Sequence, residues 1–341
     1  MKVMQNIHSR RRNCGLTLIE IMVAITVSVV LLAGVAQIFM SSKQSYKLQD
    51  SLAYVQENGR FALDFIAQDL RHAGYWGASA DASRITGTVD HIAVTGANFN
   101  LCAADWGLLL DQRVFGVNNN VGSYACVPTA GAEQYSGGDI LALRFATQEA
   151  LTEADLAAQP AGDLFLRSTY TAGRLFTAAL RSDAGNVLDV YGSAQTLHRL
   201  QARAYYVGDS GATCQVGTAK IPIPALYRVR LNNDGTLVRE RLVSGVEDLQ
   251  FQYGVDTDTD GVANQYFDAQ NVPDFTAWNG TGAAPAGRVV AVRMWILMRA
   301  ECPDMLYKNT NKYELGDRID TTPKNDNFRR QIYETTIALR N

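Results

Sequence analysis

The feature that most constrains this chain is a run of twenty uncharged residues near the N-terminus, Ile21–Met40. A helix rises about 1.5 Å per residue, so the run would span about 30 Å, the thickness of a bilayer's hydrocarbon core. The fifteen residues at the start of the chain hold four cations, Lys2 and Arg10–Arg12, and no acid. Because cytoplasmic segments are enriched in Lys and Arg, the run predicts a membrane-spanning helix with a cytoplasmic N-terminus.

A glutamate, Glu20, directly precedes the uncharged run. An ionisable side chain at the centre of a membrane helix costs about 2.5 to 3.5 kcal/mol and usually marks function. Near a helix end the side chain can reach the polar interface, so a tolerated interfacial acid is the alternative interpretation. A secretory signal peptide is cleaved after its apolar core, whereas the small residue Gly15 comes before it here. Cleavage after Gly15 would keep the helix as an anchor.

The run GLTLIE at residues 15–20 resembles the processing site of type IV prepilins and type II secretion pseudopilins. The resemblance implies that a membrane peptidase cleaves after Gly15 and methylates the new N-terminal amine of Leu16, where the family usually has Phe. A carboxylate in a bilayer needs a positive partner. The resemblance implies that Glu20 pairs with the N-terminal amine of a pilin, its own or a neighbour's, and so sets the register of assembly.

Four later stretches are similar to the PilW family of type IV minor pilins. They are GRFALDFIAQDLRHAGY (59–75), LVSGVEDLQFQYGVDTDTDG (242–261), VVAVRMWILMRAE (289–301) and the terminal RRQIYETTIALRN. The resemblance implies a structural subunit, not an enzyme, in the tip or initiation complex that primes type IV pilus assembly and supports adhesion or twitching motility. The alternatives are a J-type minor pseudopilin of a type II secretion system, generally a shorter chain, and a membrane-anchored periplasmic enzyme or binding module.

The resemblance also implies partners and a location. The partners are other minor pilins, the major pilin, the prepilin peptidase, the inner-membrane assembly platform and a tip adhesin. Before assembly the chain would cross the inner membrane once, with its head in the periplasm. After assembly it would lie in the pilus fibre, at the tip.

The helix continues beyond the uncharged run. From Leu52 to Leu70, apolar residues and Gly59 recur at spacings of three and four, with polar residues such as Asp69 assigned to the other faces. His72 followed by Ala73 and Gly74 predicts the helix end, and Gly59 predicts close packing of a strand against the helix. We expect a leader at 1–15, a membrane-spanning helix at 16–40, its amphipathic continuation at 41–73 and a β-rich head at 74–341.

The fold class expected from this pattern is α+β and type IV pilin-like, with the long helix packed on an antiparallel β-sheet head that carries long loops. The clearest strand signal is the alternation within Val289–Arg299. Loop-rich segments are expected at 96–138, 147–197 and 254–287. The other predicted strands are Ile85–Val94, Asp139–Phe145, Leu200–Val207, Leu226–Leu231, two within Thr236–Tyr253, and Gln331–Leu339.

The composition argues against broad binding to nucleic acid. The 341 residues have a net charge of −3, and removal of the four leader cations leaves 27 Lys and Arg against 34 Asp and Glu, or −7. An acidic balance of this kind argues against broad non-specific binding to DNA, and a local basic patch cannot be recognised from the sequence. The sequence also has no G-x-S-x-G motif, P-loop or dinucleotide fingerprint. No cofactor is required by any motif.

The cysteines predict disulfides. Processing would remove Cys14 with the leader and leave four cysteines in a periplasmic head, a compartment where disulfides persist. Four cysteines allow three pairings. We favour Cys102–Cys126, which would close a Gly/Asn-rich loop, with Cys214–Cys302 as the remaining pair.

One acidic run has the spacing of a calcium loop. The run DTDTDGVAN at residues 256–264 carries carboxylates at positions 1, 3 and 5, glycine at position 6 and asparagine at position 9, as in an EF-hand. Position 12 is Phe267 in place of Glu, and the aspartate that follows can substitute for it. The alternative is a solvated acidic turn between strands. A bound Ca²⁺ would be structural, with the candidate ligands Asp256, Asp258, Asp260, Val262, Asn264 and Asp268.

Overall fold

The structure is a computed structural model that describes residues 17–79, 81–87, 104–119, 124–180, 194–232, 236–272, 275–278 and 287–339. The chain divides into two units, Met1–Leu52 and Ala53–Asn341, and each is described by itself. The predicted leader, with Gly15 and Leu16, lies outside the described residues.

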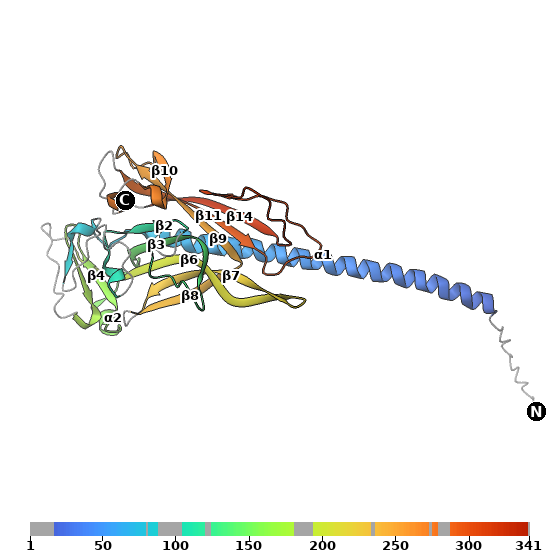
Figure 1. The fold of residues 1–341 in the computed structure, drawn as a ribbon. Coiled ribbons are helices and arrows are strands. Elements are labelled where there is room, and N and C mark those ends of the chain that lie inside the picture. The colour runs from blue at the N-terminus through green and yellow to red at the C-terminus, as the bar shows by residue number, and fades with distance from the viewer. Residues whose placement is uncertain are drawn as a thin grey trace, which may run out of the picture. The chain divides into compact units, whose positions relative to one another are not determined.

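The long helix α1 comprises Leu18–His72, so it ends at the predicted residue (Figure 1). Gly74 follows with a φ of +80°, the left-handed conformation that commonly terminates helices. We call residues 18–52 the anchor half and residues 53–72 the head half. Large apolar side chains of the anchor half are exposed, and this helix is long and apolar enough to cross a membrane by length and composition.

The head half is amphipathic as predicted. Its buried residues recur at spacings of three and four, which places them on one face. Gly59 lies against the ring of Tyr333, where an added Cβ would come within 2.2 Å of Cε2. The predicted close approach of a strand to this glycine is therefore confirmed. Asp69 departs from the prediction, because it is buried and not on a polar face. The buried residues are Val55, Gly59, Ala62, Ile66, Ala67, Asp69 and Leu70.

The larger sheet of the head has eight strands in the order β1-β5-β4-β6-β3-β2, with β7 pairing β6 and β8. All of its pairs are antiparallel except β1–β5. The strands are β1 (Ile85–Gly87), β2 (Val114–Val117), β3 (Tyr135–Ala146), β4 (Leu164–Ser168), β5 (Gly173–Thr177), β6 (Thr196–Val216), β7 (Ala219–Leu231) and β8 (Leu237–Ser244).

The second sheet is antiparallel, with the order β10-β9-β11-β14. Its strands are β9 (Val246–Asp256), β10 (Gln265–Asp268), β11 (Arg288–Arg299) and β14 (Arg330–Ala338), and a separate hairpin has β12 (Glu314–Leu315) and β13 (Arg318–Ile319). The shorter helices are α2 (Glu153–Ala157), α3 (Phe275–Trp278) and the 3₁₀ turns Ala82–Arg84, Ala104–Leu108, Ala178–Leu180 and Ala269–Asn271.

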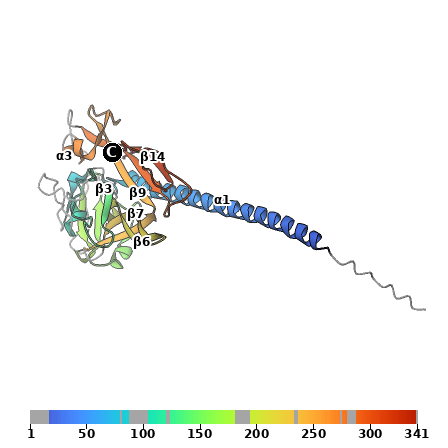
Figure 2. The same cartoon turned by 45° about the vertical axis from the view of Figure 1, so that its right-hand side comes forward.

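One hydrophobic core joins the head half of α1 to both sheets. It contains Ile66 and Leu70 of the helix, Leu141 of β3 and Met294 of β11, all essentially inaccessible to solvent. Figure 2 shows β3, β6 and β7 in one sheet and β9 and β14 in the other. The α+β fold with an antiparallel-sheet head is thus as expected from the sequence.

Candidate assembly surfaces

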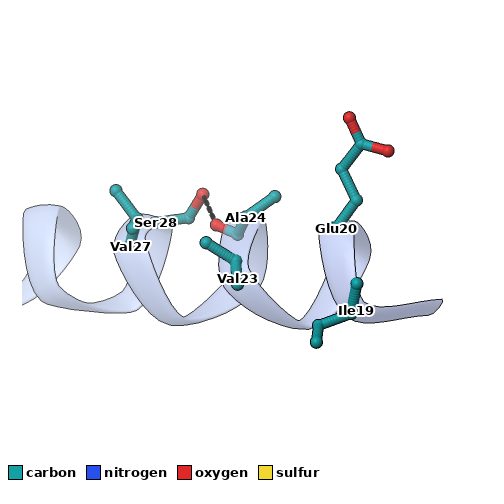
Figure 3. A pocket seen from close by; sticks show the side chains of 6 residues that line it. All are labelled: Ile19, Glu20, Val23, Ala24, Val27 and Ser28. Carbon is teal, nitrogen blue, oxygen red and sulfur yellow. Dashed lines mark hydrogen bonds between the residues drawn. The ribbon is translucent and has the colours of Figure 1, made fainter. Parts of the chain in front are cut away.

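A threonine directly before the anchor half, Thr17, caps the helix. The amide of Glu20 donates to Thr17 Oγ1 at 3.3 Å and to the Thr17 carbonyl at 3.1 Å. These bonds satisfy one of the free amides that every helix start exposes. The Glu20 side chain projects away from the helix (Figure 3), beside an open apolar hollow lined by Ile19, Val23, Ala24, Val27 and Ser28.

Glu20 has no side-chain partner, unlike the neighbouring hydroxyls of Thr26 and Ser28. Thr26 Oγ1 donates to the carbonyl of Val23 at 2.9 Å, and Ser28 Oγ donates to that of Ala24 at 2.7 Å. Both hydroxyls are satisfied within the helix, as a lipid environment requires. Among the described residues, the Glu20 carboxylate has neither a hydrogen bond nor an ion pair. The carboxylate is exposed and is therefore free to pair with a group outside the described residues.

The head half is fixed to the larger sheet by a buried carboxylate. Asp69 is 4% exposed, and its two oxygens accept hydrogen bonds from Arg203 Nη1 at 2.6 and 2.8 Å. The hydroxyl of Tyr205, the next inward-facing residue of β6, donates to the same carboxylate. Burial, followed by the nearby Asp69 charge, raises the pKa of Tyr205. This phenol therefore stays protonated and keeps donating.

Contacts at the other end of the head half join it to the second sheet. Tyr54 OH donates to Glu301 Oε1 at 2.5 Å, and Tyr333 OH donates to the carbonyl of Val55 at 3.2 Å. The next residue after Glu301 forms the Cys214–Cys302 disulfide, with a Cα–Cα distance of 5.4 Å. That bridge confirms the predicted pair. It links the β6–β7 hairpin to the segment after β11, whose Glu301 accepts the hydrogen bond from Tyr54.

The other predicted disulfide is only partly described. Cys126 is buried and disulfide-bonded. Cys102 lies outside the described residues, so the Cys102–Cys126 pairing stays a prediction.

The acidic loop after β9 brings three of its predicted ligands together. The carboxylates of Asp256, Asp258 and Asp260 have oxygen atoms within 4.8 Å of one another. Asp256 is buried and accepts from the amides of Asp258 at 3.2 Å, Thr259 at 2.6 Å and Gly261 at 2.8 Å. Burial raises the pKa of Asp256, but these amides outweigh it and the pKa lies below its usual range. The loop is therefore held by its own backbone as an acidic turn.

The remaining predicted ligands have different roles. Asn264 Oδ1 accepts from the amide of Thr257 at 2.7 Å, which closes the loop. Asp268 pairs with Gln252 across the β9–β10 ladder, four residues before Asp256 and so about 13 Å away along the strand. Asp268 is therefore not part of the carboxylate cluster, and its substitution for the EF-hand Glu stays a prediction. Val262 is exposed, and its amide donates to Asp260 Oδ1 at 2.7 Å.

Comparison with known families agrees with this architecture. A family model described as type IV pilus-assembly protein W matches residues 204–341, and a model of the prokaryotic N-terminal methylation motif matches residues 10–36. These two matches support the assignment of the chain as a type IV pilus minor pilin of the PilW family. The methylation motif includes Glu20, and the PilW match begins in β6 and runs through β14. A search of curated proteins and a search of solved structures each found no match.

The Asp69–Arg203–Tyr205 contact is the part of this pilin that sequence reasoning missed. The available signal was Asp69 itself, an acid next to the apolar positions Ala62, Ile66 and Leu70 on the helix. Its partners lie 134 and 136 residues away. No local spacing could have revealed them.

Proposed function

We propose that this pilin belongs to the tip or initiation complex that primes type IV pilus assembly, and that it supports adhesion or twitching motility through that complex. It acts as a structural subunit, without catalysis. Its partners are other minor pilins, the major pilin, the inner-membrane assembly platform and a tip adhesin, and the prepilin peptidase is its processing enzyme. The observation that carries the proposal is the first part of the anchor half, residues 18–40, in which Glu20 is the one charged residue and has no partner among the described residues.

The sequence of events follows from the physical demands of that segment. Residues 16–40 first cross the inner membrane, with the N-terminus in the cytoplasm and the head in the periplasm. The peptidase cleaves after Gly15 and methylates Leu16. On extraction into the fibre, the helices of neighbouring pilins take over the role of lipid in covering the apolar side chains. Glu20 then pairs with the N-terminal amine of a pilin, which fixes the register because an unpaired carboxylate in that environment is costly.

The test is a count of surface pili sheared from a clean deletion strain in which pilus retraction remains active, next to a complemented strain. The proposal predicts few or no pili without the protein and normal numbers after complementation. Undiminished pili in the deletion strain would contradict a priming role. Secretion of exoproteins by the same strain then distinguishes a subunit of a type II secretion pseudopilus.

We also propose that the acidic loop binds Ca²⁺ as a stabilising ion. Three carboxylates lie within 4.8 Å, whereas the cation facing them among the described residues is Arg288, whose Nε lies 3.6 Å from Asp256 Oδ2. Ca²⁺ favours several oxygen ligands in a flexible loop. Because the oxygens of Asp256 already accept amide hydrogen bonds, the affinity should be weak, about 10⁻⁴ to 10⁻³ M. Calorimetric titration that detects no heat at millimolar Ca²⁺ would contradict this proposal.

A further inference from the structure

The outer edge of β14 is the longest unprotected strand edge in the described part of the head. β14 is the last strand of the second sheet and pairs only with β11 among the described strands. It has nine residues, and Glu334 is the one charged residue within its interior. An edge of this kind presents a row of unpaired backbone groups that can template another strand.

The other terminal strands of the two sheets are blunted. β1, β2 and β10 have only three or four residues each. β8 has eight residues, but Arg239, Glu240 and Arg241 occupy its middle. Short strands and charged residues are the devices by which proteins prevent edge-to-edge association. β14 has nine residues and a single interior charge, Glu334, so it is the least protected of these terminal strands.

The direction of the backbone groups of β14 follows from its ends. The Leu339 amide donates to the Val290 carbonyl at 2.8 Å, and the Arg329 carbonyl accepts from the Ala300 amide at 2.9 Å. Because groups alternate along an antiparallel strand, odd-numbered residues of β14 bond to β11. The amides and carbonyls of the even-numbered residues therefore point outward. These residues are Arg330, Ile332, Glu334, Thr336 and Ala338.

The side chains of this edge indicate the chemistry of its partner. Glu334, Thr336 and Ala338 are exposed, on the face opposite to Tyr333, which packs on the helix. Glu334 has no cation in ion-pairing distance among the described residues. Opposite charges placed across neighbouring strands stabilise a sheet. An incoming strand would therefore carry Lys or Arg opposite Glu334 and small or β-branched residues opposite the other two.

We propose that β14 receives an extended strand from a different, neighbouring pilin subunit, which adds to the second sheet through the outward groups of residues 332–338. This inference rests on the proposed function, since it supplies the contact by which the head meets another subunit. Backbone hydrogen bonds would give the affinity, and the cation opposite Glu334 would give the selectivity. Only the β14 edge of the second sheet would receive a strand, because β10 at the other edge is too short.

The test uses the full-length chain co-expressed with the other minor pilins of the same cell and purified as a complex in detergent. Thr336→Pro removes one outward amide while leaving the bonds to β11, and Thr336→Ala is the matched control that keeps the amide. Loss of a hydrogen bond worth about 1.4 kcal/mol raises a dissociation constant about tenfold, so the proline variant should bind its partner about tenfold more weakly. The alanine variant should bind as the wild type does. Equal binding by the proline variant would overturn the proposal.

A second readout covers the case in which the proline variant fails to fold, as judged by its melting temperature and by oxidation of Cys214–Cys302. Amide hydrogen exchange of the wild-type complex should slow at Glu334 and Thr336 and remain unchanged at Thr335 and Ile337. Fast exchange of the two even-numbered amides in the complex would overturn the proposal. Concentration-dependent protection of those amides in the isolated chain would show a second copy as the occupant, and would equally overturn it. If Glu20→Ala blocks assembly while Thr336→Pro does not, the proposed function stands and only this inference fails.

Discussion

The two halves of α1 belong to one helix but satisfy the hydrophobic effect in different ways. In the anchor half, Leu31 and Leu32 are 65% and 68% exposed, whereas Val55 and Ile66 of the head half are 1% and 0% exposed. The first half must find its cover in a membrane or in other subunits, because burial of apolar surface is what stabilises such a segment in water. The second half finds its cover within its own chain.

This difference separates stability from assembly. Changes in the head half should act on folding of the head, since the buried residues of α1 all lie there. Changes in the anchor half should leave folding intact and act on membrane insertion and on contacts with other pilins. The predictions that follow probe this separation.

The largest effect is expected from Asp69→Ala. It would leave the half-buried guanidinium of Arg203 and the buried hydroxyl of Tyr205 without their carboxylate, and breaking a fully buried ion pair costs about 3 to 5 kcal/mol, which is the upper limit here. Asp64→Ala is the matched control, because its ion pair with Arg60 is solvent-exposed and worth less than about 1 kcal/mol. Chemical unfolding of the full chain in detergent measures both. Similar losses in the two variants would contradict the assignment of Asp69 to the head's core.

Two glycines of the same helix should respond to alanine in opposite ways. At Gly59 the new Cβ would meet the Tyr333 ring, and overpacking of this kind costs about 1 to 3 kcal/mol. At Gly34 it would meet nothing within 4 Å, so Gly34→Ala should gain up to about 1 kcal/mol of helix propensity. Thermal unfolding should therefore show a lower melting temperature for Gly59→Ala only. Destabilisation by both would break the distinction between the halves.

The pH should act on the head through Asp139. Burial, with a smaller contribution from Asp317 and Asp248, raises the pKa of this carboxyl to about 8, although the amides of Phe251 and Asn119 oppose the shift. In the unfolded chain its pKa is about 3.9. Between these two values only the unfolded state is ionised, so the group's contribution to stability falls as the pH rises and is lost above about pH 8.

Asp139→Asn should remove this pH dependence, because the amide does not titrate. Between pH 5 and pH 9 the melting temperature of the variant should therefore rise relative to that of the wild type. The anchor half has no ionisable side chain between Glu20 and Lys43, so it should not contribute to the trend. A difference that stays constant across this range would refute the role given to Asp139.

The smallest effect is expected from calcium. At several millimolar Ca²⁺ a site with a dissociation constant of about 1 mM stabilises the folded state by about 1 kcal/mol. The head's melting temperature should rise by a few degrees with Ca²⁺, and Asp258→Ala should abolish the rise. A rise that persists in the variant would assign the effect to another part of the head.

What the sequence could predict depended on the range of the interactions. The helix end at His72, the position of β11 and the close contact at Gly59 follow from local spacing and propensity, and all three are confirmed. The strands β4 and β5 lie inside the segment 147–197, which was expected to be a loop. The sequence did not reveal them because each has only five residues and gains its stability from pairing with distant strands. Local periodicity cannot report such pairing.

The candidate site shows the same limit. The acidic spacing brought Asp256, Asp258 and Asp260 together as predicted, because those residues share one tight turn. Asp268 lies outside the cluster because it belongs to β10. This strand runs antiparallel to β9 and places Asp268 opposite Gln252, away from the turn. Asp69, which contacts Arg203 of β6, was assigned to a polar face of the helix. Helical periodicity alone does not distinguish a buried acid with a partner from an exposed one.

The most direct test of the account is incorporation of Glu20→Ala into sheared pili, quantified against the amount of processed protein in the membrane. Because the Glu20 carboxylate has no described partner and lies outside the head, the variant should be cleaved and methylated, and its head should fold with the wild-type melting temperature. Its incorporation should fall sharply, and Glu20→Asp should restore part of it. Normal incorporation of the alanine variant would contradict the claim that this carboxylate sets the register of assembly.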